Sequence, residues 1–319
     1  MEDHSFKLHI MLKRRRFIQQ SGAAALGGLL FSNPSLAGLF SQPAQHKIGL
    51  QLFTFFNSID NDVSGTLKKI AGIGYTEIES AFSRKGGYYG MKASEFNAML
   101  KDMGMVWKSH HVIGAPFKLP PGRKMPLDAD GKPMVMPVMR NLRDNYQELV
   151  DEVAGAGVPY LVCASTPIST MEEIKDSIAV LKKTGDACKK AGVQFVYHNH
   201  DAEFRAVEGK IPYDLFLAET DPEAVKMELD LAWAVKGGMN PVDLFKKHPG
   251  RFPLWHVKDL DSKHETVLPV GAGTIDFKPI FAAAKTAGMQ HFFVEHDMPQ
   301  DAVASITSSY GYLTNTLKV

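Results

Sequence analysis

The sequence of 319 residues has only two cysteines, Cys163 and Cys188, which excludes a fold built on a disulfide framework. One lies in a predicted strand and the other in a predicted helix, so we expect both to be buried as small hydrophobic side chains. The sequence also lacks an excess of charge of one sign, because 36 Lys and Arg stand against 35 Asp and Glu. A nucleic-acid-binding surface needs a clearly basic face, so this balance argues against a nucleic-acid partner.

The N-terminal region lacks a membrane-spanning run, because its apolar stretch, residues 22–31, is well short of the roughly 20 residues that cross a bilayer. This stretch follows a basic run at residues 13–16 and precedes a small-x-small site at residues 35–37, as in a secretory signal. The twin arginines followed by x-Phe-Ile resemble a Tat signal, which exports folded proteins in bacteria. We therefore expect residues 1–37 to be a Tat-type signal peptide and the mature protein to be periplasmic, without a stable membrane span. Two alternatives remain open: the segment is an uncleaved membrane anchor, or the protein starts at Met11.

Residues 38–319 fit one (β/α)₈ TIM barrel, which takes about 250 residues. Hydrophobic residues make up 45% and charged residues 22%, enough for a large core. Short apolar runs, the first predicted over residues 47–55, alternate with stretches of helical periodicity. An insertion at about 114–137, with six prolines and three glycines, follows the third predicted strand. Such a long loop is often functional, so we interpret it as a lid or substrate wall. A solvated insertion and a contact in a homo-oligomer are the alternatives.

Four apolar segments in the second half of the chain end in side chains that bind metals. Each reads as a buried strand, and the segments follow one another at the spacing of strand-helix units. A parallel barrel gathers its strand C-termini at one face, so these side chains are expected to meet there. They are His198 or His200, Asp230, His256 and Glu295. Nitrogen and carboxylate ligands suit one divalent ion such as Mn²⁺, Zn²⁺, Co²⁺, Fe²⁺ or Mg²⁺.

These segments resemble the xylose-isomerase-like TIM-barrel superfamily, which includes sugar isomerases and epimerases, inosose dehydratases and endonuclease IV repair enzymes. The resemblance implies a TIM barrel with one metal held by residues from four strands. Asp230, His256 and Glu295 match three of the family's ligands, and His198 stands where the family has its first Glu. The run from His198 to Asp201 is similar to an H-N-H-D subgroup. Register favours His198 as the fourth ligand, and His200 remains the alternative because strand side chains alternate.

Further polar side chains lie at the predicted strand ends and are candidates for the chemistry. Trp233 stands where relatives with more metals carry His, which argues for a single metal and against endonuclease IV chemistry. Each candidate also has a purely structural interpretation. His110 and His111 could be structural histidines, Glu79 could form a salt bridge at a strand end, and Trp233 could be a core aromatic residue. The predicted catalytic residues are Glu79, His111, Lys258 and Glu295, and the predicted substrate contacts are His110, His200 and Trp233.

The function predicted from the resemblance is a metal-dependent isomerase or epimerase that converts a free sugar or keto-sugar through an enediolate. Replacement of the first Glu by His198 removes one base, so dehydration of a keto-sugar or inosose, or lysis of a keto-glycoside, is the alternative. A third interpretation is a sugar-binding barrel without activity. In each case the expected partner is a small carbohydrate.

Overall fold

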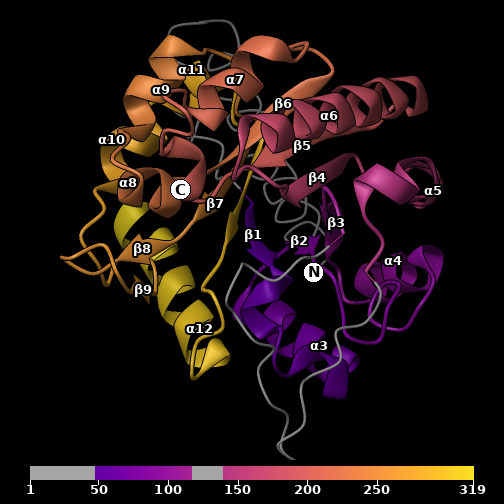
Figure 1. Cartoon of the computed structure of the whole chain (residues 1–319). Coiled ribbons are helices and arrows are strands. Elements are labelled where there is room, and N and C mark those ends of the chain that lie inside the picture. The colour runs from indigo at the N-terminus through magenta and orange to yellow at the C-terminus, as the bar shows by residue number, and fades with distance from the viewer. Residues whose placement is uncertain (1–46, 117–138) are drawn as a thin grey trace, which may run out of the picture. The chain divides into compact units, whose positions relative to one another are not determined.

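Eight parallel strands close into a barrel, which confirms the TIM-barrel prediction (Figure 1). The computed structural model describes residues 47–116 and 139–319, so the predicted signal peptide and nearly all of the predicted insertion lie outside the described residues. The strands adjoin in the order β1-β10-β7-β6-β5-β4-β3-β2. Their bounds are β1 Ile48–Gln51, β2 Glu77–Ser80, β3 Val106–Ile113, β4 Tyr160–Ser165, β5 Gln194–His198, β6 Val225–Asp230, β7 Leu254–Val257 and β10 His291–Val294.

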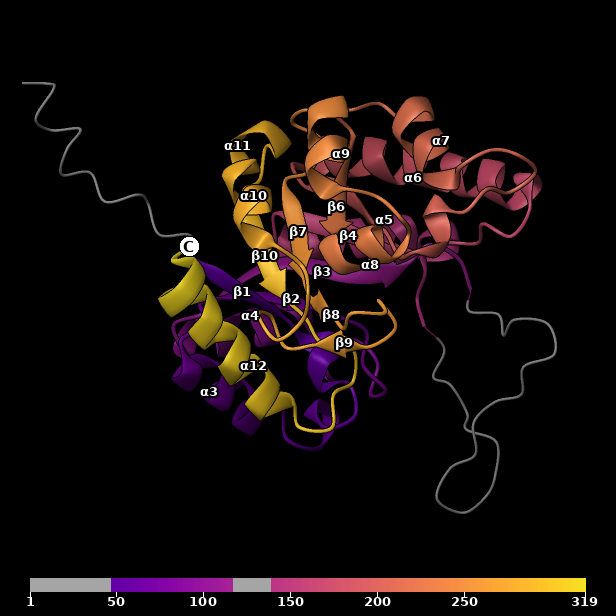
Figure 2. The same cartoon turned by 90° about the vertical axis from the view of Figure 1, so that its left-hand side faces the viewer.

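Helices connect the strands, and a small antiparallel hairpin of β8 (Asp259–Leu260) and β9 (Val267–Leu268) follows β7. The hairpin lies beside α12 in both views (Figures 1 and 2). None of the helices in the described part of the chain has the length and apolar character needed to cross a membrane. The helices are α3 Val63–Ile73, α4 Ala93–Asp102, α5 Leu142–Gly155, α6 Met171–Ala191, α7 Pro212–Glu219, α8 Leu231–Lys236, α9 Pro241–Lys247, α10 Phe277–Ala282, α11 Ala284–Ala287 and α12 Ala302–Tyr312.

Local sequence signals fix where these elements begin and end. Thr170 caps α6 by accepting a hydrogen bond from the Glu173 amide, and Gly192 ends the helix in the left-handed conformation at φ 74°. The first strand is shorter than predicted. It ends at Gln51, whose side chain accepts a hydrogen bond from the Phe53 amide and turns residues 52–55 into a 3₁₀ helix.

The barrel has an inner and an outer apolar layer, and strand alternation divides side chains between them. On β5, Phe195 and Tyr197 belong to the large core cluster, where Tyr197 meets a helix residue, Phe216 of α7. Val196 instead joins a small inner cluster, whose members are Val162, Val196, Leu254 and Phe293. Both cysteines are buried, as expected, and neither forms a disulfide.

Inner-layer packing is so close at one position that only glycine fits. A Cβ at Gly49 on β1 would lie 2.4 Å from Cδ1 of Phe293 and 2.7 Å from the carbonyl oxygen of Phe292. We expect Gly49→Ala to lower the free energy of unfolding by about 1–3 kcal/mol, the usual cost of overpacking a core. Chemical denaturation measures this change. The matched control is Gly72→Ala in α3, where a Cβ meets nothing within 4 Å. This substitution should stabilise the helix by about 0.5–1 kcal/mol. Equal midpoints for the two variants would contradict the packing argument.

Candidate metal centre and active site

Polar side chains continue the inner layer toward the C-terminal ends of the strands. His256 follows the inner-layer residue Leu254 by two positions, and Glu295 follows Phe293 in the same way. Because side chains alternate along a strand, both point into the barrel. The same alternation directs His198 inward after Val196, whereas the sequence alone left open which of His198 and His200 binds the metal.

Three of the predicted metal ligands come together in one group, namely Asp230, His256 and Glu295. The Nδ1 atom of His256 lies 2.7 Å from Glu295 Oε2 and 3.8 Å from Asp230 Oδ2. His198 borders this outer group, with its Nε2 atom 3.9 Å from Asp230 Oδ2. All four side chains are buried. The strand ends therefore place two carboxylates and two imidazoles around one point.

A second, inner group shares His256 with the first and consists of His111, His198, Glu228 and His256. The Oε2 atom of Glu228 lies 2.7 Å from His111 Nε2, 3.2 Å from His198 Nδ1 and 3.3 Å from His256 Nε2. Sequence reasoning did not select Glu228. Its position two residues before Asp230 on β6 was the available signal, because residues i and i+2 share a face of a strand.

Buried atoms without hydrogen-bond partners show that these residues fit a divalent metal. Glu228 Oε1, Asp230 Oδ2 and His256 Nδ1 are fully buried and make no hydrogen bond of suitable geometry within the described part of the chain. Asp230 Oδ2 and His256 Nδ1 have ionic contacts, with Lys258 Nζ at 2.9 Å and with Glu295 Oε2 at 2.7 Å. Glu228 Oε1 has no such contact in the described part of the chain, and a buried polar atom left in this way is costly unless a ligand binds it. Imidazole nitrogens and carboxylate oxygens are donors that Zn²⁺, Mn²⁺ and related ions accept.

Glu79, a predicted catalytic residue, lies beneath the metal centre and is completely buried. It accepts hydrogen bonds from the Gln51 side-chain amide at 2.8 Å and from the Ser109 hydroxyl, and lies 3.1 Å from His111 Nε2. Its Oε1 atom is 2.5 Å from His256 Nε2, which leaves Nδ1 of His256 facing Asp230 and Glu295. A carboxylate behind a histidine orients the ring toward a metal. Glu79 therefore positions the His256 ring through this contact.

Lys258 brings a buried positive charge to the rim of the outer group. Its Nζ atom lies 2.7 Å from Glu295 Oε2, 2.9 Å from Asp230 Oδ2 and 3.0 Å from Asp297 Oδ2. These carboxylates raise the pKa of Lys258 well above its usual value despite the opposing effect of burial. Lys258 is thus a fixed cation, and it links the two metal-facing carboxylates to Asp297.

The carboxylates of the two groups have pKa values shifted in opposite directions. Burial alone would raise the pKa of Glu295, but Lys258 and His256 hold it well below its ordinary range. Burial and the neighbouring Glu79 carboxylate raise the pKa of Glu228 to about 7. Burial opposes the charged form of His111, but Glu79 and Glu228 outweigh it and raise the pKa of His111 to about 9. At neutral pH Glu295 is therefore a carboxylate.

The segment after β5 is held by two buried polar side chains. Asn199 accepts a hydrogen bond from the Asp230 amide at 3.1 Å, and Glu203 accepts one from the His200 amide at 2.9 Å and another from the Tyr197 hydroxyl at 2.8 Å. The Asn199 bond ties the end of β5 to the end of β6, and the Glu203 bonds fix the segment that follows β5. The His200 ring is left half-buried, outside both groups of metal-binding side chains.

A cavity of about 130 Å³ opens over the metal centre. Its acidic residues, Glu295 and Asp297, both follow β10. Its imidazoles come from β3 and the end of β5, which are each three strands away from β10 around the closed barrel. One wall is therefore acidic, although Lys258 also lines it and pairs with both of its carboxylates. The wall across the barrel carries imidazoles, which are His111, His198 and His200. Phe53 and Phe82 add an apolar side. Trp233 does not line the cavity, although its ring lies 6.1 Å from that of His200.

His110, a predicted substrate contact, lies outside this cavity. Its Nδ1 atom is 2.7 Å from the Ser80 hydroxyl, and its ring packs on Tyr88 at 4.8 Å. Burial, reinforced by the neighbouring His111, lowers the pKa of His110 to about 3. The alternative interpretation, a structural histidine, fits this geometry.

This environment predicts a pH dependence of stability. The pKa of His110 is lower in the folded than in the unfolded chain. Its contribution to the free energy of unfolding is therefore complete above pH 6.5 and is lost as pH falls. We expect lowering the pH from 6.5 to 5 to remove about 2 kcal/mol through this residue. Denaturation of His110→Phe and the wild type at both pH values measures the difference. Equal pH dependence of the two proteins would contradict it, and loss of turnover in His110→Phe would place His110 at the substrate instead.

Comparisons with known proteins agree with this architecture. The model of the xylose isomerase-like TIM barrel family matches residues 67–313. An inosose dehydratase of Geobacillus thermodenitrificans is 30% identical over 156 residues, 44% of this chain and 52% of that protein. The chain spans about half the length of the first curated relatives that it matches.

Solved structures extend the likeness over most of the chain. A sugar phosphate isomerase/epimerase of Parabacteroides distasonis has a TM-score of 0.69 at 27% identity, covering 88% of this chain and 97% of that one. An IolI protein with a bound zinc atom has a TM-score of 0.61 at 16% identity and covers 84% of this chain and 97% of its own. At that identity the second likeness concerns the fold alone.

Proposed function

Because the chain belongs to the xylose isomerase-like TIM barrel family, we propose that it is a metal-dependent enzyme that removes the proton next to a carbonyl group of a keto-sugar. The observation that carries the proposal is the outer group, in which Asp230, His256 and Glu295 offer donor atoms within 4.8 Å of one another beside a cavity. His198 would complete the ligand set. A bound divalent ion would act as a Lewis acid on the carbonyl oxygen and make the adjacent C–H more acidic.

The proposed chemistry begins at Glu295, which is buried and charged at neutral pH. Its carboxylate accepts the proton from the carbon next to the carbonyl group. Lys258, 2.7 Å from that carboxylate, holds it in place and stabilises negative charge that develops on the substrate. Glu79 keeps the His256 ring in position, as its 2.5 Å contact with Nε2 indicates.

The distribution of groups around the cavity favours elimination as the next step. The acidic residues lie on one wall, and His200 lies across the barrel on the wall of imidazoles. The C–H electron pair passes into a carbon–carbon double bond as the bond from the β carbon to its oxygen breaks. The His200 ring acts as the general acid and gives a proton to that oxygen, which leaves as water or as an alcohol. The inosose dehydratases among the relatives support this direction.

Isomerisation or epimerisation is the second candidate, and it shares the first proton transfer. The solved sugar phosphate isomerase/epimerase, at 27% identity over 88% of this chain, supports it. In that reaction the proton returns to carbon, and no oxygen is expelled. The two candidates therefore differ in whether the substrate loses a group.

The test is to incubate the purified, metal-loaded protein in D₂O with an inosose, a 3-keto-glucoside and free ketoses. Nuclear magnetic resonance and mass spectrometry then follow deuterium uptake and loss of groups. Loss of water or of the aglycone is the result expected for elimination. Deuterium uptake without such loss would replace elimination by isomerisation or epimerisation. Absence of both from every substrate would overturn the enzyme proposal and favour a sugar-binding barrel.

A further inference from the structure

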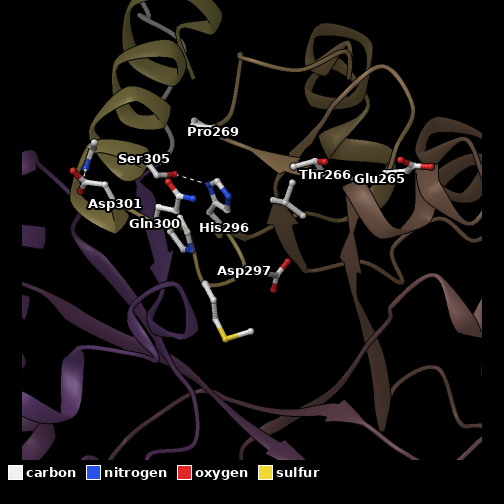
Figure 3. A pocket seen from close by; sticks show the side chains of 12 residues that line it. Glu265, Thr266, Pro269, His296, Asp297, Gln300, Asp301 and Ser305 are labelled. Atoms are coloured by element: carbon white, nitrogen blue, oxygen red, sulfur yellow. Dashed lines mark hydrogen bonds between the residues drawn. The ribbon is translucent and has the colours of Figure 1, made fainter. Parts of the chain in front are cut away.

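A second, larger hollow shares Asp297 with the cavity over the metal centre. Figure 3 shows the side chains that line it. It is a groove of about 700 Å³ between residues 265–269, around β9, and residues 296–305, from the end of β10 into α12. Figure 3 shows Gln300, Asp301 and Ser305 on one side, Glu265 and Thr266 on the other, and Asp297 between them. Small-molecule sites take roughly 300–1,000 Å³. The groove reaches that size, and the cavity over the metal centre, which shares Asp297 with it, adds about 130 Å³.

Asp297 joins the two hollows, because it lines both. Its carboxylate oxygens accept hydrogen bonds from Lys258 Nζ at 3.0 and 3.2 Å, and the same nitrogen contacts Glu295. The groove therefore starts one ion pair away from the proposed base. A molecule with its carbonyl group in the cavity and a second unit attached would extend past Asp297 into the groove.

The walls of the groove are held in shape. The His296 amide donates to the Thr54 hydroxyl at 3.0 Å, and its ring nitrogen Nδ1 lies 2.8 Å from Ser305 Oγ (Figure 3). Between these anchors and α12, Met298 adopts a φ of 46°, which an L residue rarely accepts, and its side chain is 49% exposed. Such backbone strain persists only where the surroundings impose it, and it gathers at binding sites.

The groove lining is rich in hydrogen-bond acceptors and bears negative charge, which Lys258 offsets only at Asp297. Glu265, Asp297 and Asp301 contribute carboxylates, and Thr266 and Gln300 contribute neutral polar groups. In the described part of the chain no lysine or arginine lines the groove. A carboxylate-lined surface accepts hydrogen bonds from hydroxyl groups and repels phosphate or carboxylate groups.

We propose that this groove binds a second, uncharged, hydroxyl-bearing unit of the substrate, such as another sugar ring, so that the substrate is a neutral two-unit glycoside rather than a sugar phosphate. This inference rests on the proposed function, because it assumes that the reacting sugar occupies the cavity above the metal centre. Met298 and Gln300 then lie over or beside the second unit, and Asp297 marks the bond between the two units.

The experiment compares one-unit and two-unit ligands in three metal-loaded proteins: the wild type, Ala304→Trp and Val303→Trp. Ala304 lines the groove, and Val303 is an exposed neighbour on the same helix that does not. We expect the wild type to bind maltose or cellobiose at least tenfold more tightly than glucose by calorimetry, and maltose 6′-phosphate at least tenfold more weakly than maltose. Ala304→Trp should remove the preference for two units without changing glucose binding, and Val303→Trp should keep it.

Calorimetry with these unreactive sugars keeps the groove separate from the reaction. A wild type that binds glucose as tightly as both disaccharides, an Ala304→Trp protein that keeps the preference, or tighter binding of the phosphate would overturn the groove proposal. Turnover of a keto-sugar together with any of these results would leave the proposed function standing. Conversely, a two-unit preference that Ala304→Trp abolishes supports the groove even if no keto-sugar is converted.

Discussion

Replacement of His256 by Ala is expected to abolish both metal retention and turnover. This ring touches both groups of metal-binding side chains, with Nδ1 at Glu295 and Asp230 and Nε2 at Glu79 and Glu228. Loss of a residue that only orients a ligand lowers metal affinity about 10–100-fold, so removing the ligand itself should cost at least about 100-fold. Metal analysis after dialysis and kcat/KM on the active substrate measure the two effects.

The same change also leaves buried carboxylates without a partner, which destabilises a protein by about 3–5 kcal/mol. Circular dichroism and His256→Asn, which keeps a polar side chain of similar reach, separate loss of metal from loss of fold. The matched control is His291→Ala, a histidine paired with Glu77 at the other end of the barrel strands. That variant should keep its metal. A folded His256→Ala protein with normal metal content and turnover would remove His256 from the metal centre.

The parts of the site that the sequence predicts are those that depend only on strand ends. Each run of apolar residues stops at a polar side chain, and closure of a parallel barrel brings such ends to one face. This reasoning places Asp230, His256 and Glu295 together without knowledge of packing, and the structure has the same arrangement. The bounds of α6 are equally local, because a threonine cap and a left-handed glycine define them.

The parts that sequence reasoning missed depend on contacts between distant strands. Glu228 is one of three charged residues on β6, and its role emerges only when His111 of β3 and His198 of β5 face it. Likewise, the contact of Glu79 with His256 joins residues 177 positions apart. The groove arises from the β8–β9 hairpin, whose strands of two residues are too short to show a periodic pattern.

Replacement of Glu295 by Gln is expected to stop proton removal while the barrel stays folded. The amide keeps the size of the side chain but cannot accept a proton, and loss of a general base usually costs about 10²–10⁴-fold in rate. Metal affinity should fall less than in His256→Ala, because the Gln side chain keeps a carbonyl oxygen that can bind a metal, whereas Ala offers no donor atom. Deuterium exchange at the substrate carbon and turnover should disappear together, since Glu295 acts in the step that they share.

The control for Glu295→Gln is Glu77→Gln, which makes the same change in a buried carboxylate. Glu77 bonds to His291 and stands 3.6 Å from Lys108, below the inner layer and far from the cavity. We expect this variant to have a lower free energy of unfolding but to keep deuterium exchange at the substrate carbon. If Glu295→Gln kept deuterium exchange and lost only turnover, Glu295 would act after the proton leaves carbon, and an imidazole of the opposite wall would be the base. If it kept both, the acidic wall would only bind the metal, and the assignment of base and acid to opposite walls would have to be reversed.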